Sequence, residues 1–258
     1  MNKILAIAHL VSKELYRRKD VYVLFVLTAV LTLLLASMSF FNDASAARYI
    51  KELCLALIWL STLVVGIMTA ARQLPAEREQ RTICPLLAKP VTRGQVIVGK
   101  FLGCWLSTGV ALVVFYGFFM VVAGTREHAW PLSSYLQAIW LHWAMLGMVI
   151  ALTMVGSVTF SAPSSNTTIV LIVALAILGI GRHLNKVAVG LPEPASSIVY
   201  FLYFCIPHLE FFDLRDFIIH DWGATSWAAC TLAVVYALSY MGLFLTAAWF
   251  IFRRKPLT

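Results

Sequence analysis

The stretch Gly94–Lys100 matches the GxxxxGK spacing of a phosphate-binding loop, so it is the first candidate for nucleotide chemistry. Such a loop needs glycines whose backbone N–H groups surround the phosphates, and a Ser or Thr after the lysine to hold magnesium. Here Phe101 follows Lys100, and the interior of the match is apolar. We therefore interpret the match as a coincidence and expect no ATP or magnesium site in this chain.

The sequence also lacks other catalytic and metal-binding signatures. The sequence has no GxSxG elbow, no HExxH pair and no Asp-rich pattern of a lipid synthase. Its five cysteines are scattered, without the CxxC or Cys/His spacing of a zinc site. We expect a protein that is not an enzyme and holds neither metal nor cofactor.

His142 is the one titratable residue deep inside a long apolar run. A single histidine in that position predicts a side chain packed at a helix contact and argues against haem held by paired histidines. The long runs also lack the embedded Asp, Glu, Lys or Arg that ion-coupled carriers use. Energy for any transport is therefore expected from outside the membrane.

Polar and aromatic residues alternate in Pro207–Asp216, which includes His208, Glu210, Asp213 and Asp216. We favour an amphipathic gate segment resting at the membrane interface. The alternative is a membrane enzyme or assembly factor with a headgroup or metal-handling site around residues 201–221. Loss of a lipid or metal activity on alanine substitution, with no ATPase present, would favour that alternative.

The elements that position these residues are apolar. Hydrophobic residues make up 61% of the 258 residues and charged residues only 12%, against roughly 45–50% and 25% in soluble domains. A bilayer core about 30 Å thick requires about 20 apolar residues in a helix. Five runs reach that length, and a shorter sixth follows the turn-forming residues 161–166. The six predicted spans are Val21–Phe41, Leu53–Ala71, Phe101–Ala123, Leu136–Phe160, Thr167–Gly181 and Ser226–Phe252.

The remaining segments are predicted to lie at the two membrane surfaces. Residues 1–20 place apolar side chains at helical spacing and predict an interfacial elbow helix. Residues 182–225 alternate turns with brief apolar stretches, and we expect interfacial or re-entrant segments on the outer face. The fold class is thus an all-α polytopic membrane protein, with 1–258 as a single permease domain.

Positive charge indicates the orientation. Of the 20 Lys and Arg residues, 14 fall on one side of the predicted spans and 6 on the other, where acidic residues dilute them. The positive-inside rule then places both termini in the cytoplasm, which requires an even number of spans. The formal charge of +8 lies in short clusters between apolar runs, a distribution that argues against nucleic acid as a partner.

The segment between the second and third spans is the most polar stretch on the cytoplasmic side. Pro75 suits the first turn of a helix, and Glu77 and Glu79 complement the positive helix N-terminus. Thr92 and Gln95 have the spacing of a capping box, so the third span is expected to start near Arg93, inside the cytoplasm. The pattern is typical of a docking segment bound by another protein, although composition alone is equally compatible with an ordinary solvated loop.

This segment resembles the signature loop of type-2 ABC exporter permeases. The similar stretches are 77–83 (Glu-Arg-Glu-Gln-Arg-Thr-Ile), 86–94 and 96–103, together with Lys13-Glu14 and Arg17-Arg18 ahead of the first span. The resemblance implies a coupling helix at 75–87 and an elbow helix, both near an ATPase subunit. The residues it implies in that contact are Glu77, Arg78, Glu79, Arg81, Ile83, Leu86, Arg93, Lys13 and Glu14.

The resemblance also implies the assembly and its setting. The implied complex has two ABC ATPase subunits, which hold ATP and Mg, and a second permease copy, in the bacterial inner membrane. Membrane lipid and an accessory protein on the outer face complete the expected partners. Two positions depart from the family pattern, because Arg81 stands where glycine is usual and Pro85 interrupts the helix. The substrate is not readable from the sequence.

Overall fold

The structure is a computed structural model that describes residues 3–17, 19–37, 44–79, 91–128 and 130–255. These residues form helices and connecting turns, and no strand occurs among them. The elements are α1 (Lys3–Arg17), α2 (Lys19–Ser37), α3 (Ala44–Arg72), α4 (Pro75–Glu79), α6 (Arg93–Glu127), α7 (Leu132–Thr159), α8 (Pro163–Gly190), α9 (Ala195–Cys205), the 3-10 turn η1 (Leu209–Phe212), α10 (Arg215–Ile219) and α11 (Trp227–Arg254).

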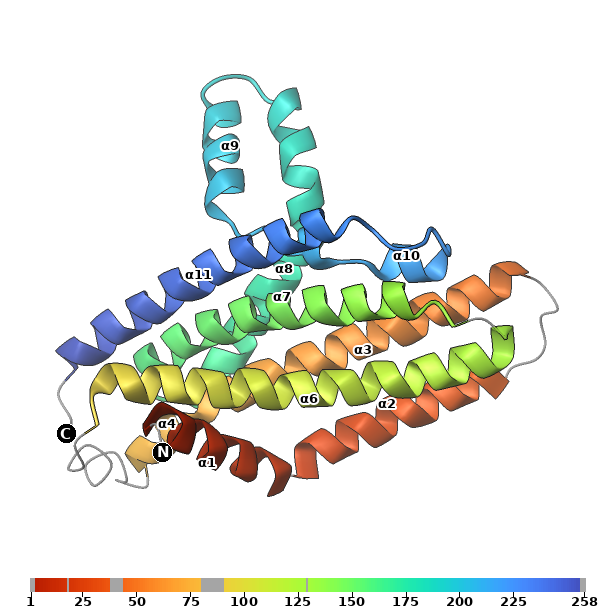
Figure 1. The fold of residues 1–258 in the computed structure, drawn as a ribbon. Coiled ribbons are helices and arrows are strands. Elements are labelled where there is room, and N and C mark those ends of the chain that lie inside the picture. Colours follow the sequence, from red (N-terminus) through yellow and green to blue (C-terminus); the bar gives the residue numbers. More distant parts are fainter. Residues whose placement is uncertain (1–2, 18, 38–43, 80–90, 129, 256–258) are drawn as a thin grey trace.

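Helix α7 lies at the centre of the bundle and contacts α3, α6, α8 and α11 (Figure 1). The start of α1, α4, the start of α6 and the end of α11 lie at one end of the bundle, which we call the terminal end. The short helix α10 and the turn from α6 to α7 lie at the opposite end. The start of the first helix and the end of the last therefore share one end of the molecule.

Four helical segments are long and apolar enough to cross a membrane among the described residues: Arg48–Glu79, Arg93–Thr125, Leu132–Thr159 and Trp227–Arg254. A fifth would be the pair Ala195–Cys205 and Leu209–Ile219, which is bent by 42°. Tyr22–Leu34 and Pro163–Gly179 are shorter apolar helices. Each of the six predicted spans thus falls on a helix, while the number six remains a prediction for α2 and α8.

Helix α6 begins as the sequence predicts. Thr92 is its N-cap, accepting a hydrogen bond from the backbone N–H of Gln95, and the Gln95 side chain accepts one from the Thr92 N–H. The helix has 35 residues, about 52 Å at 1.5 Å per residue, which exceeds the hydrocarbon core of a bilayer. Gly94–Lys100 lies inside this helix, so the GxxxxGK match is not a loop.

Helix α1 is amphipathic, as expected, and its apolar face packs against α6. Ala8, Val11 and Leu15 are buried at this contact. The contact is close because α6 presents glycines: a Cβ at Gly103 would lie 2.7 Å from Val11 Cβ and 2.8 Å from the Ala8 carbonyl oxygen. Helix α1 is therefore seated on a helix of the bundle and is not held by the membrane surface alone.

A pair of tryptophans joins α6 to α7. The rings of Trp105 and Trp143 are stacked with their centroids 4.5 Å apart, and each indole N–H donates to the backbone carbonyl of the other residue. An indole N–H needs an acceptor when water is scarce, so the reciprocal bonds satisfy both rings. The result is a fixed register between the two helices.

Helix α8 is longer than predicted. The fifth helix was predicted to end at Gly181, whereas α8 continues to Gly190 and packs against α9. The reason is that residues 182–189 contain neither Gly nor Pro, and breakers first appear at Gly190, Pro192 and Pro194. The second half of α8 and α9 project together from the bundle as a helical hairpin (Figure 1).

The α1–α6 contact generates a prediction. Gly103→Val should lower the free energy of unfolding by about 1–3 kcal/mol, because overpacking forces α1 away from α6. The measurement is the thermal unfolding midpoint of the purified chain in detergent. Gly117→Val is the matched control, since Gly117 lies in the same helix and a Cβ there would meet no atom within 4 Å. Equal shifts in both variants would show that α1 does not depend on this close approach.

Candidate functional site

A two-residue turn separates α3 from α4 at the terminal end. Helix α3 ends at Arg72, and Pro75 begins α4 after the two-residue turn Gln73–Leu74. Proline disfavours a helical residue before it and lacks the N–H that a helix interior needs, so it both ends one helix and starts the next. Helix α4 leads directly into residues 80–90, which lie outside the described residues.

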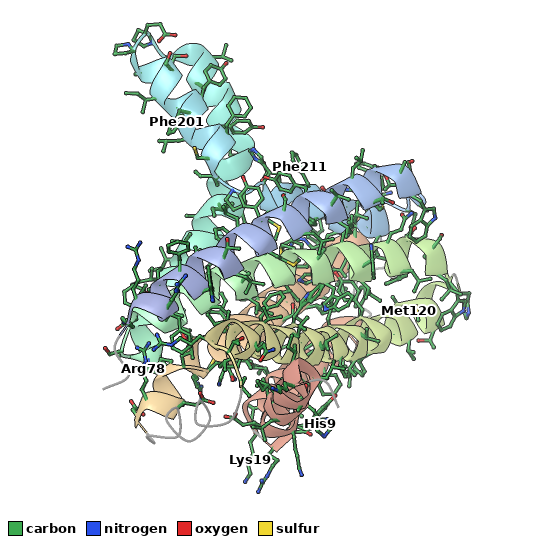
Figure 2. The ribbon with its side chains drawn as sticks, turned by 60° about the vertical axis from the view of Figure 1, so that its left-hand side comes forward. His9, Lys19, Arg78, Met120, Phe201 and Phe211 are labelled. Atoms are coloured by element: carbon green, nitrogen blue, oxygen red, sulfur yellow. The ribbon has the colours of Figure 1, made fainter. Side chains whose placement is uncertain are left out.

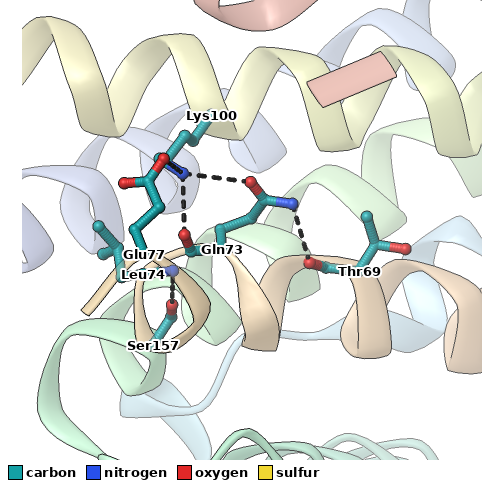
Figure 3. A network of polar contacts seen from close by, with 6 residues as sticks. All are labelled: Thr69, Gln73, Leu74, Glu77, Lys100 and Ser157. Atoms are coloured by element: carbon teal, nitrogen blue, oxygen red, sulfur yellow. Dashed lines mark hydrogen bonds and ion pairs between the residues drawn. The ribbon is translucent and has the colours of Figure 1, made fainter. Parts of the chain in front are cut away.

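Lys100 of α6 is the centre of a polar network at this turn (Figure 3). Its ammonium group donates to the Gln73 carbonyl at 2.8 Å and forms an ion pair with Glu77 Oε1 at 2.7 Å. The Lys100 side chain is 4% exposed and that of Glu77 22% exposed. A charge so removed from water must be paired to be tolerated. The network therefore fixes α4 to α6.

The same turn is attached to the end of α7. The Leu74 N–H donates to Ser157 Oγ at 3.2 Å, and Arg78 donates to the Val158 carbonyl at 3.2 Å. Lys255 donates to the carbonyls of Val158 and Thr159 at 2.9 and 3.0 Å. Cations at a helix C-terminus satisfy free carbonyls and complement the negative end of the helix dipole. Burial and the nearby Arg78 charge lower the pKa of Lys255.

Arg93 joins the start of α6 to the end of α11. One of its guanidinium nitrogens lies 2.6, 2.9 and 3.1 Å from the carbonyl oxygens of Phe252, Arg253 and Lys255. The guanidinium also lies over the Phe252 ring, 5.4 Å from its centroid. Polar contacts at the terminal end thus connect α4 and the turn that follows α3 to three other helices, α6, α7 and α11.

The predicted contact residues fall into three groups. Glu77, Arg78 and Arg93 have partners within the chain. Glu79 is exposed, as are Lys13 and Glu14 on α1. Arg81, Ile83 and Leu86 lie outside the described residues, as does most of the coupling helix predicted at 75–87.

The partners that complete this network were not predicted from the sequence. Lys100 entered only the GxxxxGK match and, with Lys255, the count of positive residues that indicates the orientation, and Gln73 and Ser157 were given no role. One signal was present: Lys100 lies between the apolar stretch Val96–Gly99 and the predicted span Phe101–Ala123, and a cation in apolar surroundings needs a partner. The identity of that partner could not be read from the spacing along the chain.

The outer-face candidates lie near the opposite end and form two local pairs. His208 Nδ1 lies 3.1 Å from Glu210 Oε1, and the backbone N–H of His208 donates to the Tyr236 hydroxyl of α11. Asp213 accepts two hydrogen bonds from the Arg215 guanidinium, each 2.9 Å long. Asp216 is exposed. The four residues therefore do not converge on one centre.

Arg215 connects this outer segment to the bundle core. Its guanidinium lies over the ring of Trp59 in α3, 4.8 Å from the centroid. Trp59 in turn stacks on His142 at 4.5 Å, and His142 hydrogen-bonds Thr62 at 3.2 Å. His142 is fully buried, which confirms the prediction of a packed histidine. A chain of ring contacts thus runs from the outer segment into the middle of the bundle.

These features define a class: a multi-pass helical membrane protein with a polar, multi-helix junction at one end and an aromatic contact to a surface segment near the other. Comparison with known proteins identifies the family. The model of the ABC-2 family transporter protein matches residues 6–257, so the chain belongs to that family and is the membrane-spanning permease component of an ABC transporter. A search of curated proteins found no match.

The Glu77–Lys100 pair generates the second prediction. Glu77→Gln and Lys100→Gln should each lower the free energy of unfolding by about 1–3 kcal/mol, because each leaves a largely buried group without its partner. The double variant should lose less than the sum of the two. The measurement is unfolding by SDS titration, followed by tryptophan fluorescence.

Glu79→Gln is the control for this cycle, since Glu79 lies on the same short helix but is exposed. It should change stability by less than about 0.5 kcal/mol. Strictly additive effects of the two single substitutions would contradict a direct Glu77–Lys100 interaction.

Proposed function

We propose that this chain is the permease subunit of an ATP-driven exporter and that a separate ATPase subunit docks on the segment after α4. The observation that carries the proposal is the polar junction around Lys100, because it connects α4, which leads into that segment, to α6 and α7, and Arg93 connects α6 to α11. A displacement of α4 would therefore act on several long helices at once. Membership of the ABC-2 transporter family supports the presence of such a partner.

The proposed setting is the bacterial inner membrane, with six spans and both termini in the cytoplasm. The start of α1 and the end of α11 lie together at the terminal end (Figure 1). Most of the Lys and Arg residues belong to segments assigned to that side. Both observations favour the terminal end as the cytoplasmic one.

We assign different roles to the two glutamates of α4. Glu79 is exposed and leads into residues 80–90, so it is proposed to meet basic residues of the ATPase. Glu77 is engaged with Lys100 and is proposed to carry motion to α6. The docking contact would continue with Arg81, Ile83 and Leu86, and Lys13 and Glu14 on α1 would form a second contact.

The proposed cycle follows from these connections. ATP and Mg are bound in the partner, and this chain supplies no step of hydrolysis. Closure of the two ATPase subunits would displace α4. Helices α6 and α7 would move with α4 because they contact it, and α11 would move with α6 through Arg93. Near the opposite end the outer segment would then separate from α3, where Arg215 rests on Trp59. His208, Glu210, Asp213 and Asp216 are accordingly proposed as gate residues.

A second copy of the permease is expected to complete the pathway. The ABC-2 family supports a dimeric arrangement. The projecting hairpin of α8 and α9 exposes large apolar side chains, such as Phe201 at 68% and Phe204 at 73% (Figure 2). These side chains would face lipid or the second copy.

The docking proposal yields the third prediction. Glu79→Lys should weaken binding of the ATPase subunit by roughly tenfold or more, because a like charge would face the partner's basic residues. Stimulation of ATP hydrolysis by the permease should fall with it, while membrane insertion and thermal stability stay unchanged. The measurements are co-purification of the two subunits and ATPase activity in reconstituted vesicles.

Glu193→Lys is the matched control, because Glu193 is an exposed glutamate in the turn between α8 and α9. It carries the same charge reversal away from the terminal end and should leave binding and stimulation intact. An unchanged affinity in Glu79→Lys, or an equal loss in Glu193→Lys, would contradict docking at α4.

A further inference from the structure

A narrow apolar groove lies where α1 meets α2, against the side of α6. Its volume is about 230 Å³. The lining includes Leu15 at the end of α1, Tyr22 and Phe25 at the start of α2, and Val110 and Val114 of α6. On α6 it extends from Ser107 to Phe115, about 12 Å along the helix. We call this feature the corner groove.

Basic residues lie close to the corner groove along the chain. Arg17 directly follows the lining residue Tyr16, Lys19 lies three positions from both Tyr16 and Tyr22, and Arg17 and Lys19 are exposed. The Lys19 side chain points away from the bundle (Figure 2). The run 17–20 contains three cations and Asp20, so its net charge is +2. The groove therefore has an apolar interior and a positively charged entrance.

Two exposed tyrosines indicate the level in the membrane at which the groove opens. Tyr16 and Tyr22 are 53% and 54% exposed, and the Tyr22 hydroxyl donates to the Tyr16 carbonyl. Exposed tyrosines next to cations are typical of the boundary between lipid headgroups and acyl chains. Beyond the entrance, α2 and the facing part of α6 carry exposed valines such as Val26 and Val110. The groove thus runs from the headgroup level towards the apolar core of the membrane.

The lining of the groove decides what fits it. The lining side chains are apolar except for the hydroxyl groups of Tyr16, Tyr22 and Ser107. The Tyr22 and Ser107 hydroxyls already donate to the Tyr16 carbonyl and to Ser12. A single acyl chain is narrow, flexible and apolar throughout, as the lining requires.

We propose that the corner groove binds one acyl chain of an anionic phospholipid of the cytoplasmic leaflet, and that Arg17 and Lys19 hold its phosphate-bearing headgroup. The lipid would bridge α1, α2 and α6 at the point where the chain enters the membrane. Binding is expected to favour an anionic headgroup over a zwitterionic one, because cations near a membrane surface attract anionic lipid. The site requires neither an ATPase nor transport.

Native mass spectrometry of the purified full-length chain tests the acyl-chain part. The probe is an equimolar mixture of phosphatidylglycerol and phosphatidylcholine with identical acyl chains. The unmodified chain should retain phosphatidylglycerol. The amount of bound phosphatidylglycerol should be at least tenfold lower in Val110→Trp, because the indole fills the groove.

Val113→Trp is the matched control for that substitution. Val113 lies on the same helix and is 53% exposed, against 48% for Val110, but it does not line the corner groove. It should retain the lipid. Equal loss in both tryptophan variants would overturn the proposal, as would loss of a protein dimer in Val110→Trp with lipid binding unchanged, since a second copy would then cover the groove.

The headgroup part is tested by charge removal. The double variant Arg17→Gln with Lys19→Gln should lower the preference for phosphatidylglycerol by about 25-fold, because each cation contributes about fivefold. Arg253→Gln with Arg254→Gln removes the same charge from exposed residues at the end of α11 and should leave the preference intact. No preference in the unmodified chain, or equal loss in both double variants, would refute the assignment of Arg17 and Lys19.

Discussion

A lysine ammonium group buried between helices must be neutralised, and the terminal end of this protein is organised around that requirement. Lys100 is on α6, and its partners Gln73 and Glu77 come from the turn and helix that follow α3. Burial makes the pair sensitive to geometry, since a small displacement leaves a charge without compensation. Such a contact fixes the position of one helix relative to another more firmly than a flexible surface ion pair does.

The other contacts at this end follow a common physical rule. Helices α7 and α11 both end here with free carbonyl groups, and the cations Arg78, Lys255 and Arg93 donate to them. The carbonyl groups at a helix end need donors, and the negative end of the dipole favours positive ones. The basic residues from which the membrane orientation is predicted thus also connect the helix ends. Near the opposite end, one cation acts differently, because Arg215 contacts the Trp59 ring.

Much of the fold was predictable because it depends on local patterns. Thr92 and Gln95 form the predicted capping box, Pro75 begins the predicted short helix, and His142 is packed as expected. The end of α8 was predicted wrongly, since a change to more polar composition at Arg182 was taken for a helix end where no breaker was present. The site was only partly predicted. The sequence shows two glutamates two residues apart, and this spacing does not reveal that Glu79 is exposed while Glu77 pairs with Lys100.

The sequence alone determined that the chain lies in a membrane, where its apolar helices run, and which loop carries the charges suited to a partner. These properties follow from composition and short-range spacing, because a bilayer requires long apolar helices with internally satisfied backbones. Only the tertiary structure decided that Lys100 pairs with Glu77, that Arg93 contacts the end of α11, and that α1, α2 and α6 leave an apolar groove between them. Residues up to 162 positions apart meet in these contacts, and the packing angles that bring them together are set by side chains along whole helix faces, not by local sequence.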